Sequence, residues 1–158
     1  MVTQEQADSL IDEIDEALAS LDGRDAAVQA AMRLIAKRLP HYNWVGVYLL
    51  DNGVLNLGPY VGAATEHTLI SVGHGVCGTA VAENRNMVVE DVRTLDNYLA
   101  CSLETRSEIV VLIRDINTDQ ILGQIDADSH TVGAFDTSDE QMLEQIALRL
   151  SYRLLDAA

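Results

Sequence analysis

The sequence predicts an α+β domain in which helices at both ends of the chain flank a central antiparallel sheet. Apolar residues recur with a helical period up to Pro40, with a strand-like period in the segment that follows, and with a helical period again from Thr137. Strands bracketed by terminal helices are typical of α+β domains. The length suits one domain: residues 1–158, with helices in 1–40 and the sheet core and last helix in 41–158.

Two helices are predicted before Pro40, over residues 4–21 and 24–38. Gly23 interrupts the helical pattern between them and Pro40 ends the second helix. They form either a helical hairpin or one broken helix. Each has an apolar stripe that would pack on a core: Ala7, Leu10, Ile11, Ile14, Leu18 and Leu21 in the first, and Val28, Ala31, Leu34 and Ile35 in the second.

The strands begin after Pro40. Residues 43–50 are rich in β-favouring side chains, and Asp51-Asn52-Gly53 predicts a hairpin turn because Asn-Gly accepts positive φ angles. Residues 54–57 form the return strand, which Gly58-Pro59 closes. A third strand is expected near residues 68–72.

The second half of the chain continues the sheet and ends in a helix. Thr137 and Glu140 have the spacing of a capping box, so the last helix starts near Thr137. Its apolar face contains Leu143, Ile146, Ala147, Leu150 and Leu154. The other expected elements are a short helix at 77–83, a strand at 87–92, a loop or short helix at 96–103, and strands at 108–114 and 121–126 joined by a loop at 115–119.

The charge of the chain limits its partners. The formal net charge is −15, with one lysine (Lys37) beside nine arginines. Such a surface offers no basic footprint for phosphates, which excludes nucleic acid and anionic membranes as partners. No apolar run is long enough to span a bilayer and the N-terminus lacks a signal pattern, so we expect a cytoplasmic protein. The acidic, lysine-poor composition favours a salt-adapted, halophilic protein over an ordinary acidic one.

Two cysteines are candidates for redox chemistry. Cys77 follows a glycine-rich turn at the expected start of a helix, where the helix N-terminus lowers the pKa of a thiol. Cys101 lacks such support, and nearby acids would raise the pKa of its thiol. In a reducing cytosol cysteines are more often free or catalytic than structural. Burial as small apolar side chains is the alternative.

Three carboxylates are expected to converge. Glu108 opens one strand, while Asp126 and Asp128 end the next one with a spacing that places both on the same side. If the two strands pair as a hairpin, the three groups meet at one end of it. Such a cluster can bind an ammonium group, hold a metal ion or keep a proton as a general acid. The alternative is a solvated strand end.

No sequence pattern indicates a metal site, and we expect none. The segment that begins at Asp126 departs from a calcium loop at Thr131 and Thr137, and zinc-type spacings are lacking. Trp44 and Tyr48 point to the same side of a strand. They either wall a small-ligand pocket or belong to the core, and the core is the simpler interpretation.

Several segments, taken in order, resemble the free methionine-(R)-sulfoxide reductases, which are single GAF domains. The resemblance runs from about Asn43 to the C-terminal helix and implies a GAF-like fold. The segments that carry it are Asn43-Trp44-Val45-Gly46-Val47-Tyr48, Leu57-Gly58-Pro59-Tyr60, Gly73-His74-Gly75-Val76-Cys77-Gly78-Thr79-Ala80, Ala100-Cys101, Ser107-Glu108-Ile109-Val110-Val111 and Ile125-Asp126-Ala127-Asp128-Ser129.

The resemblance implies the reduction of free L-methionine-(R)-sulfoxide by thiol chemistry. The family's catalytic cysteine corresponds to Cys101 and a recycling cysteine to Cys77. Attack by Cys101 would leave a sulfenic acid, Cys77 would condense with it to a disulfide, and an external reductant such as thioredoxin would restore both thiols. No cofactor is implied. The family's pocket acids correspond to Glu108, Asp126 and Asp128, and its aromatic wall to Trp44 and Tyr48.

The sequence also departs from the family. Many members have a third cysteine about ten residues before the Gly-Val-Cys-Gly segment, but residues 62–68 contain none. Either Cys77 resolves the sulfenic acid alone, or an external thiol reduces it directly. Leu112 stands where a proline is common, and Ser102 where an aspartate is usual. A non-catalytic GAF sensor, or a redox switch that forms a Cys77–Cys101 disulfide, is therefore the alternative function. The terminal helices either build a homodimer interface or only cover the sheet.

Overall fold

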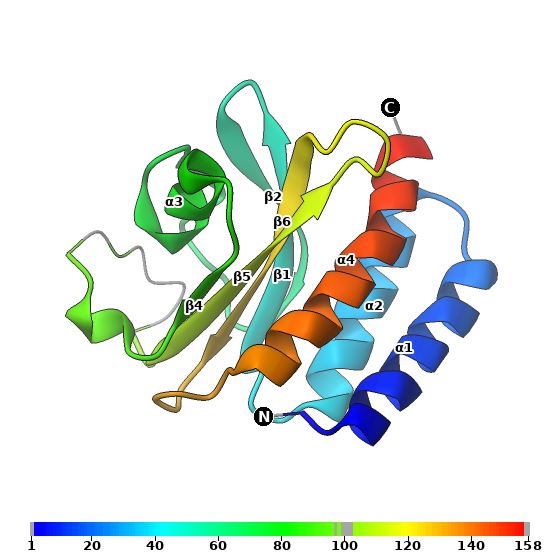
Figure 1. Cartoon of the computed structure of the whole chain (residues 1–158), viewed down its shortest axis with the longest axis horizontal. Coiled ribbons are helices and arrows are strands. Elements are labelled where there is room, and N and C mark those ends of the chain that lie inside the picture. The colour runs from blue at the N-terminus through cyan, green and yellow to red at the C-terminus, as the bar shows by residue number, and fades with distance from the viewer. Residues whose placement is uncertain (1, 97, 99–102, 157–158) are drawn as a thin grey trace.

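The computed structural model describes residues 2–96, 98 and 103–156. None of the helices in these ranges combines the length and the hydropathy that crossing a bilayer requires. In chain order (Figure 1), the elements are α1 (Gln4–Ala19), α2 (Arg24–Arg38), β1 (Trp44–Asp51), β2 (Val54–Val61), β3 (Leu69–Ser71), α3 (Gly75–Glu83), β4 (Met87–Val89), the 3₁₀ helix η1 (Val92–Thr94), β5 (Ser107–Arg114), β6 (Ile121–Ser129) and α4 (Thr137–Asp156).

The described strands form one six-stranded antiparallel sheet in the order β3-β2-β1-β6-β5-β4. Figure 1 shows α1, α2 and α4 on one side of this sheet and α3 on the other. The predicted α+β class is confirmed. Helices from both ends of the chain cover the same face, so the opposite face is left for α3 and the loops around it.

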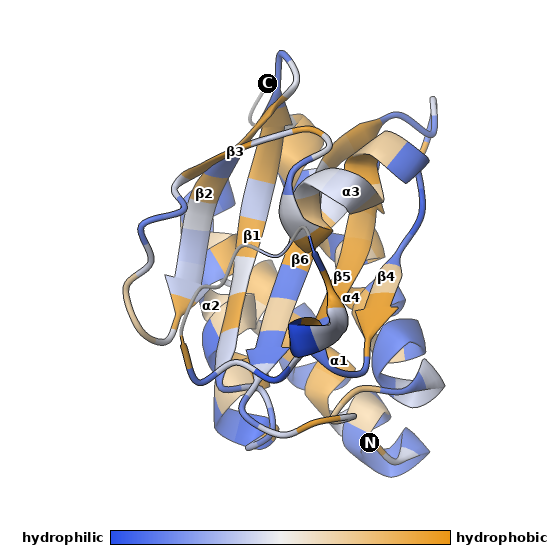
Figure 2. Ribbon diagram, turned by 90° about the vertical axis from the view of Figure 1, so that its left-hand side faces the viewer, coloured by the Kyte–Doolittle hydropathy of each residue, from blue (hydrophilic) through white to orange (hydrophobic). Residues whose placement is uncertain are grey.

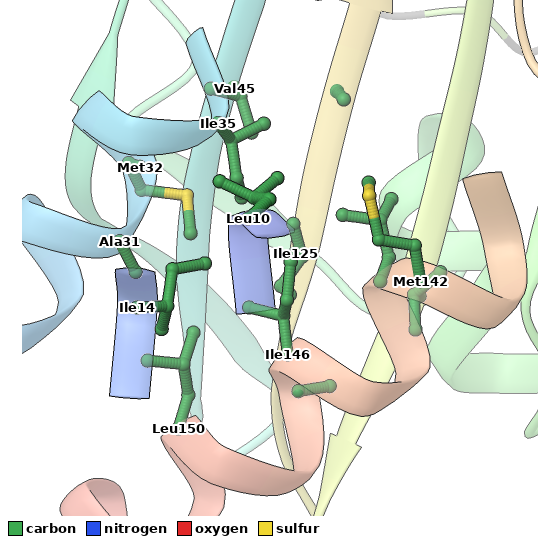
Figure 3. Close-up of a cluster of buried hydrophobic side chains, with 14 of the residues drawn as sticks. Leu10, Ile14, Ala31, Met32, Ile35, Val45, Ile125, Met142, Ile146 and Leu150 are labelled. Atoms are coloured by element: carbon green, nitrogen blue, oxygen red, sulfur yellow. The ribbon is translucent and has the colours of Figure 1, made fainter. Parts of the chain in front are cut away.

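The main apolar core lies between the sheet and the three long helices. Figure 3 shows side chains from all three helices meeting residues of β1 and β6. Every one of the side chains labelled there is almost completely buried. The labelled residues are Leu10, Ile14, Ala31, Met32, Ile35, Val45, Ile125, Met142, Ile146 and Leu150.

Strand β6 presents a different surface to each side. Ile125 and Ala127 face the helical core, whereas Asp126 and Asp128 alternate with them and face α3. Figure 2 shows the resulting hydrophilic bands in β6 within a largely hydrophobic sheet. The α3 side of the sheet therefore combines an apolar floor with buried carboxylates.

Strand β2 is longer than expected, because Pro59 does not end it. The β1–β2 register shifts between Gly46 and Tyr48, so the stretch around Gly58 and Pro59 forms an irregularity in the ladder. Proline is tolerated at such bulges because the residue there does not need to donate an amide hydrogen bond to the neighbouring strand. Strand β4 is shorter than predicted and gives way to η1. Most of the expected loop at 96–103 lies outside the described residues.

The N-terminus of α4 is capped one residue earlier than predicted. Asp136 Oδ1 accepts a hydrogen bond from the Asp139 amide at 3.4 Å, and the Asp136 amide donates to Asp139 Oδ2 at 3.1 Å. This reciprocal pair is the capping box. The prediction of Thr137 with Glu140 was therefore wrong, because an aspartate side chain with the same spacing precedes it by one residue.

Candidate functional site

Three neighbouring strands bring the predicted carboxylates together on the α3 side of the sheet. Glu108 of β5 is the register partner of Asp128 of β6, and Asp128 is in turn opposite Trp44 of β1. Asp126 lies one step along, opposite Gly46 and Val110. The expected convergence is confirmed. The alternative of a solvated strand end is wrong, because all three carboxylates are at least 97% buried, with exposed fractions of 3%, 0% and 1% for Glu108, Asp126 and Asp128.

Helix α3 places Cys77 above this floor. Gly73 and Gly75 adopt positive φ angles of 95° and 64° in the turn that precedes the thiol, a conformation that side chains disfavour. A side chain at Gly78 would begin 2.5 Å from the Ser71 carbonyl oxygen, so glycine allows α3 to lie close to β3. Cys77 is the third residue of this helix, and its buried Sγ is directed at the Glu108 carboxylate.

The thiol and two of the carboxylates form a compact trio. Cys77 Sγ lies 3.9 Å from Glu108 Oε2. The sulfur and one carboxylate oxygen from each of Glu108 and Asp126 all lie within 4.8 Å of one another. Gln124, a further buried residue on the same face of β6, donates from Nε2 to the Cys77 carbonyl oxygen at 3.0 Å. This bond ties the first turn of α3 to the sheet beneath it.

Burial changes the acidity of Asp126. Because its side chain is removed from water, the pKa of the Asp126 carboxyl is raised above its ordinary value, although hydrogen bonding to Glu108 and Cys77 opposes the rise. A carboxyl group of this kind keeps its proton to higher pH than a surface aspartate. Asp126 is therefore suited to donate a proton inside the site.

An aromatic stack borders the carboxylates. The Trp44 and Tyr60 rings are stacked with centroids 5.4 Å apart, and Tyr48 lies 6.4 Å from Trp44. Trp44 Nε1 donates to the Ala63 carbonyl oxygen at 3.0 Å. A side chain on Gly46 would begin 2.6 Å from Tyr60 Cβ and 2.8 Å from the Trp44 ring, so glycine is needed for this packing.

Two residues of this face were missed from the sequence. Tyr60 joins the aromatic stack only through the shifted β1–β2 register, which no spacing in the sequence reveals. Gln124 carried a usable signal, because it precedes Asp126 with the same two-residue spacing that links Asp126 to Asp128. Cys101, the predicted nucleophile, lies outside the described residues.

A small cavity of about 10 Å³ opens onto the trio. This is about the volume that one water molecule requires. Among the described residues, its lining consists of Cys77, Glu108 and Asp126 together with Ile70, His74, Gly75 and Val76.

Comparison with known proteins assigns the chain to a family. Residues 23–154 match the GAF domain family. The free methionine-R-sulfoxide reductase of Escherichia coli (strain K12) is 43% identical over 117 residues, which cover 74% of this chain and 69% of that protein. The chain belongs to the free methionine-R-sulfoxide reductase family of GAF domains.

Solved structures of free methionine-R-sulfoxide reductases have the same architecture. The enzyme from Neisseria meningitidis in complex with its substrate has a TM-score of 0.89 at 29% identity, covering 99% of this chain and 94% of that one. The type II enzyme from Thermoplasma acidophilum has a TM-score of 0.79 at 35% identity, covering 93% and 96%. The resemblance drawn from the sequence segments is thus confirmed.

Proposed function

We propose that this protein is an oxidoreductase that reduces free L-methionine-(R)-sulfoxide to methionine. The observation that carries the proposal is the buried trio of Cys77, Glu108 and Asp126 beside an aromatic stack, in a chain of this family. A thiol, a proton-holding carboxyl and further carboxylates are the groups that this reaction needs.

The reaction begins with attack of the Cys101 thiolate on the sulfoxide sulfur. The sulfur–oxygen bond breaks as Asp126 protonates the oxygen, which ends on Cys101 as a sulfenic acid while methionine leaves. The substrate sulfur gains two electrons and the Cys101 sulfur loses two. The raised pKa of Asp126 supports its role as the proton donor.

Recycling uses the second thiol. The Cys77 sulfur attacks the sulfenic sulfur, a disulfide forms, and the sulfenic hydroxyl group departs as water with the proton of the Cys77 thiol. A dithiol reductant such as thioredoxin then reduces the disulfide by thiol–disulfide exchange and is itself oxidised to a disulfide. The reaction therefore requires no bound cofactor. Cys77 acts as the resolving residue by itself, since the family's third cysteine is missing from residues 62–68.

Recognition of the free amino acid is assigned to the remaining acids and the aromatic stack. Glu108 and Asp128 are paired across β5 and β6 and would hold the substrate ammonium group, which a methionine residue within a peptide lacks. The stacked rings of Trp44, Tyr48 and Tyr60 would contact the methyl and methylene groups. A cavity of about 10 Å³ does not hold an amino acid, so substrate binding requires the surrounding side chains to move apart.

Turnover with excess dithiothreitol tests the proposal directly. The wild type is expected to reduce the free (R)-sulfoxide but neither the (S) epimer nor a peptide-bound sulfoxide, and Cys101→Ser is expected to be inactive. Cys77→Ser is the matched thiol control: it should keep turnover with dithiothreitol and lose it with thioredoxin. Folded wild-type protein that is inactive in both dilute buffer and molar KCl would instead indicate a GAF sensor or a redox switch.

A further inference from the structure

Cys77, Glu108 and Asp126 have the arrangement of an incomplete tetrahedral metal site. In such a site, zinc–sulfur distances of about 2.3 Å and zinc–oxygen distances of about 2.1 Å place neighbouring ligand atoms about 3.4–3.6 Å apart. The observed 3.9 Å between Cys77 Sγ and Glu108 Oε2 exceeds this by only about 0.3 Å, and all three ligand atoms lie within 4.8 Å of one another. Small rotations of these three side chains would bring their ligand atoms to coordination distance from a single ion.

Two further observations point to a ligand at this place. Outside the trio, neither carboxylate oxygen of Asp126 has a hydrogen-bond partner among the described residues, although the side chain is completely buried. A buried carboxylate in that state incurs a desolvation cost that a bound cation would offset. The cavity onto which the trio opens has a volume of about 10 Å³, which suits a single ion or water molecule.

We propose that the reduced protein binds one Zn²⁺ ion between the Cys77 thiolate and the carboxylates of Glu108 and Asp126. Mg²⁺ and Ca²⁺ prefer six or more oxygen ligands and gain little from a thiolate. A site with one sulfur, two carboxylate oxygens and a fourth position for water matches the borderline-soft Zn²⁺ ion. Binding releases the thiol proton and any proton held by the carboxyl groups.

The surroundings hold the sulfur ligand in place. The Gln124 side chain fixes the Cys77 carbonyl oxygen. The charge of a bound zinc ion itself deprotonates a coordinating thiol. The three ligands come from α3, β5 and β6 and are separated by 31 and 18 residues in the sequence, so no local ligand spacing announces the site.

The consequence for function is inhibition. Zinc at this site occupies the thiol that would resolve the sulfenic acid and the carboxyl that would protonate the leaving oxygen. This consequence rests on the proposed function, whereas zinc binding itself does not. If the zinc-free protein shows no turnover but binds zinc when it is added, the reductase proposal is refuted and the zinc site stands.

The test is a titration of the chelator-treated, reduced protein with ZnCl₂ in competition with a chromophoric zinc chelator. Molar KCl and millimolar MgCl₂ are included, because they suppress diffuse attraction of cations to a chain of net charge −15. One equivalent of zinc is expected. Cys77→Ser and Asp126→Asn should each weaken binding by about 100-fold or more, since loss of even an outer-shell partner costs 10–100-fold.

Asp128→Asn and Cys101→Ser are the matched controls, since they change a neighbouring carboxylate and the other thiol. Both are expected to bind zinc within about threefold of the wild type. Co²⁺ added to the wild type should show a thiolate-to-metal charge-transfer band, a readout that does not depend on the folding of any variant. The proposal is overturned if the wild type binds no stoichiometric zinc, if that band is missing, or if Cys77→Ser retains wild-type affinity.

Discussion

Replacing Asp139 by asparagine is expected to destabilise the domain markedly, although this residue lies away from the candidate site. The Asp139 side chain is completely buried at the start of α4. Its Oδ1 accepts from the Tyr42 hydroxyl at 2.8 Å and lies 2.9 Å from His41 Nε2, while Oδ2 accepts from the Asp136 amide. Asparagine offers one acceptor and turns an NH₂ group toward the remaining donors.

The size of the effect follows from the acidity of the carboxyl. Burial would raise the pKa of Asp139, but hydrogen bonds from His41, the Asp136 amide and Tyr42 outweigh it and hold the pKa at about 2, compared with 3.8 for an ordinary aspartate. At about 1.4 kcal/mol for each tenfold change in acid strength, the ionised form contributes about 2 kcal/mol. For a domain of this size that corresponds to roughly 4–8 °C in Tm.

The sign of the pH dependence is set by the lowered pKa. The contribution is fully present above the unfolded-state value of 3.8 and is lost as the pH falls toward about 2. Urea unfolding of the wild type and Asp139→Asn between pH 2 and pH 7 measures it. The difference in free energy of unfolding should be about 2 kcal/mol at pH 7 and shrink in acid.

The control is Asp25→Asn, which changes an acid in the first turn of α2 whose side chain is 69% exposed. It should cost less than about 1 kcal/mol. Equal stability losses in the two variants, or a loss for Asp139→Asn that does not depend on pH, would refute the reasoning.

Three other changes test the site and its surroundings. Asp126→Asn should lower kcat about 10²–10⁴-fold with little change in KM, whereas Asp128→Asn should mainly raise KM; a purely KM effect in Asp126→Asn would exclude it as the proton donor. Gly46→Ala should cost about 1–3 kcal/mol in urea unfolding, because the added methyl group meets Tyr60 and the Trp44 ring; an unchanged midpoint would show that the aromatic stack yields. The Tm should rise from dilute buffer to molar KCl if the acidic surface is salt-adapted, and a flat profile would contradict that reading.

The order and type of most elements could be predicted from the sequence, because they follow from local rules. The apolar stripes before Pro40 and after Thr137, and the Asn52-Gly53 turn, all predicted elements that the structure contains. The resemblance of ordered segments also predicted the family. Local rules failed where two adjacent residues could both serve as the N-cap. At the start of α4, Asp136 and Thr137 are such a pair, and the structure uses Asp136.

The two-residue spacing of Asp126 and Asp128 determined that both face the same side, because strand geometry is local. The spacing did not determine which face of the sheet the two side chains occupy, or that this face is buried from solvent. That depended on three long helices taking the opposite face, and on glycines that let α3 lie against β3. Burial, the raised pKa of Asp126, and the proximity of Cys77 to acids far along the chain are long-range consequences of packing, so only the tertiary structure decided them.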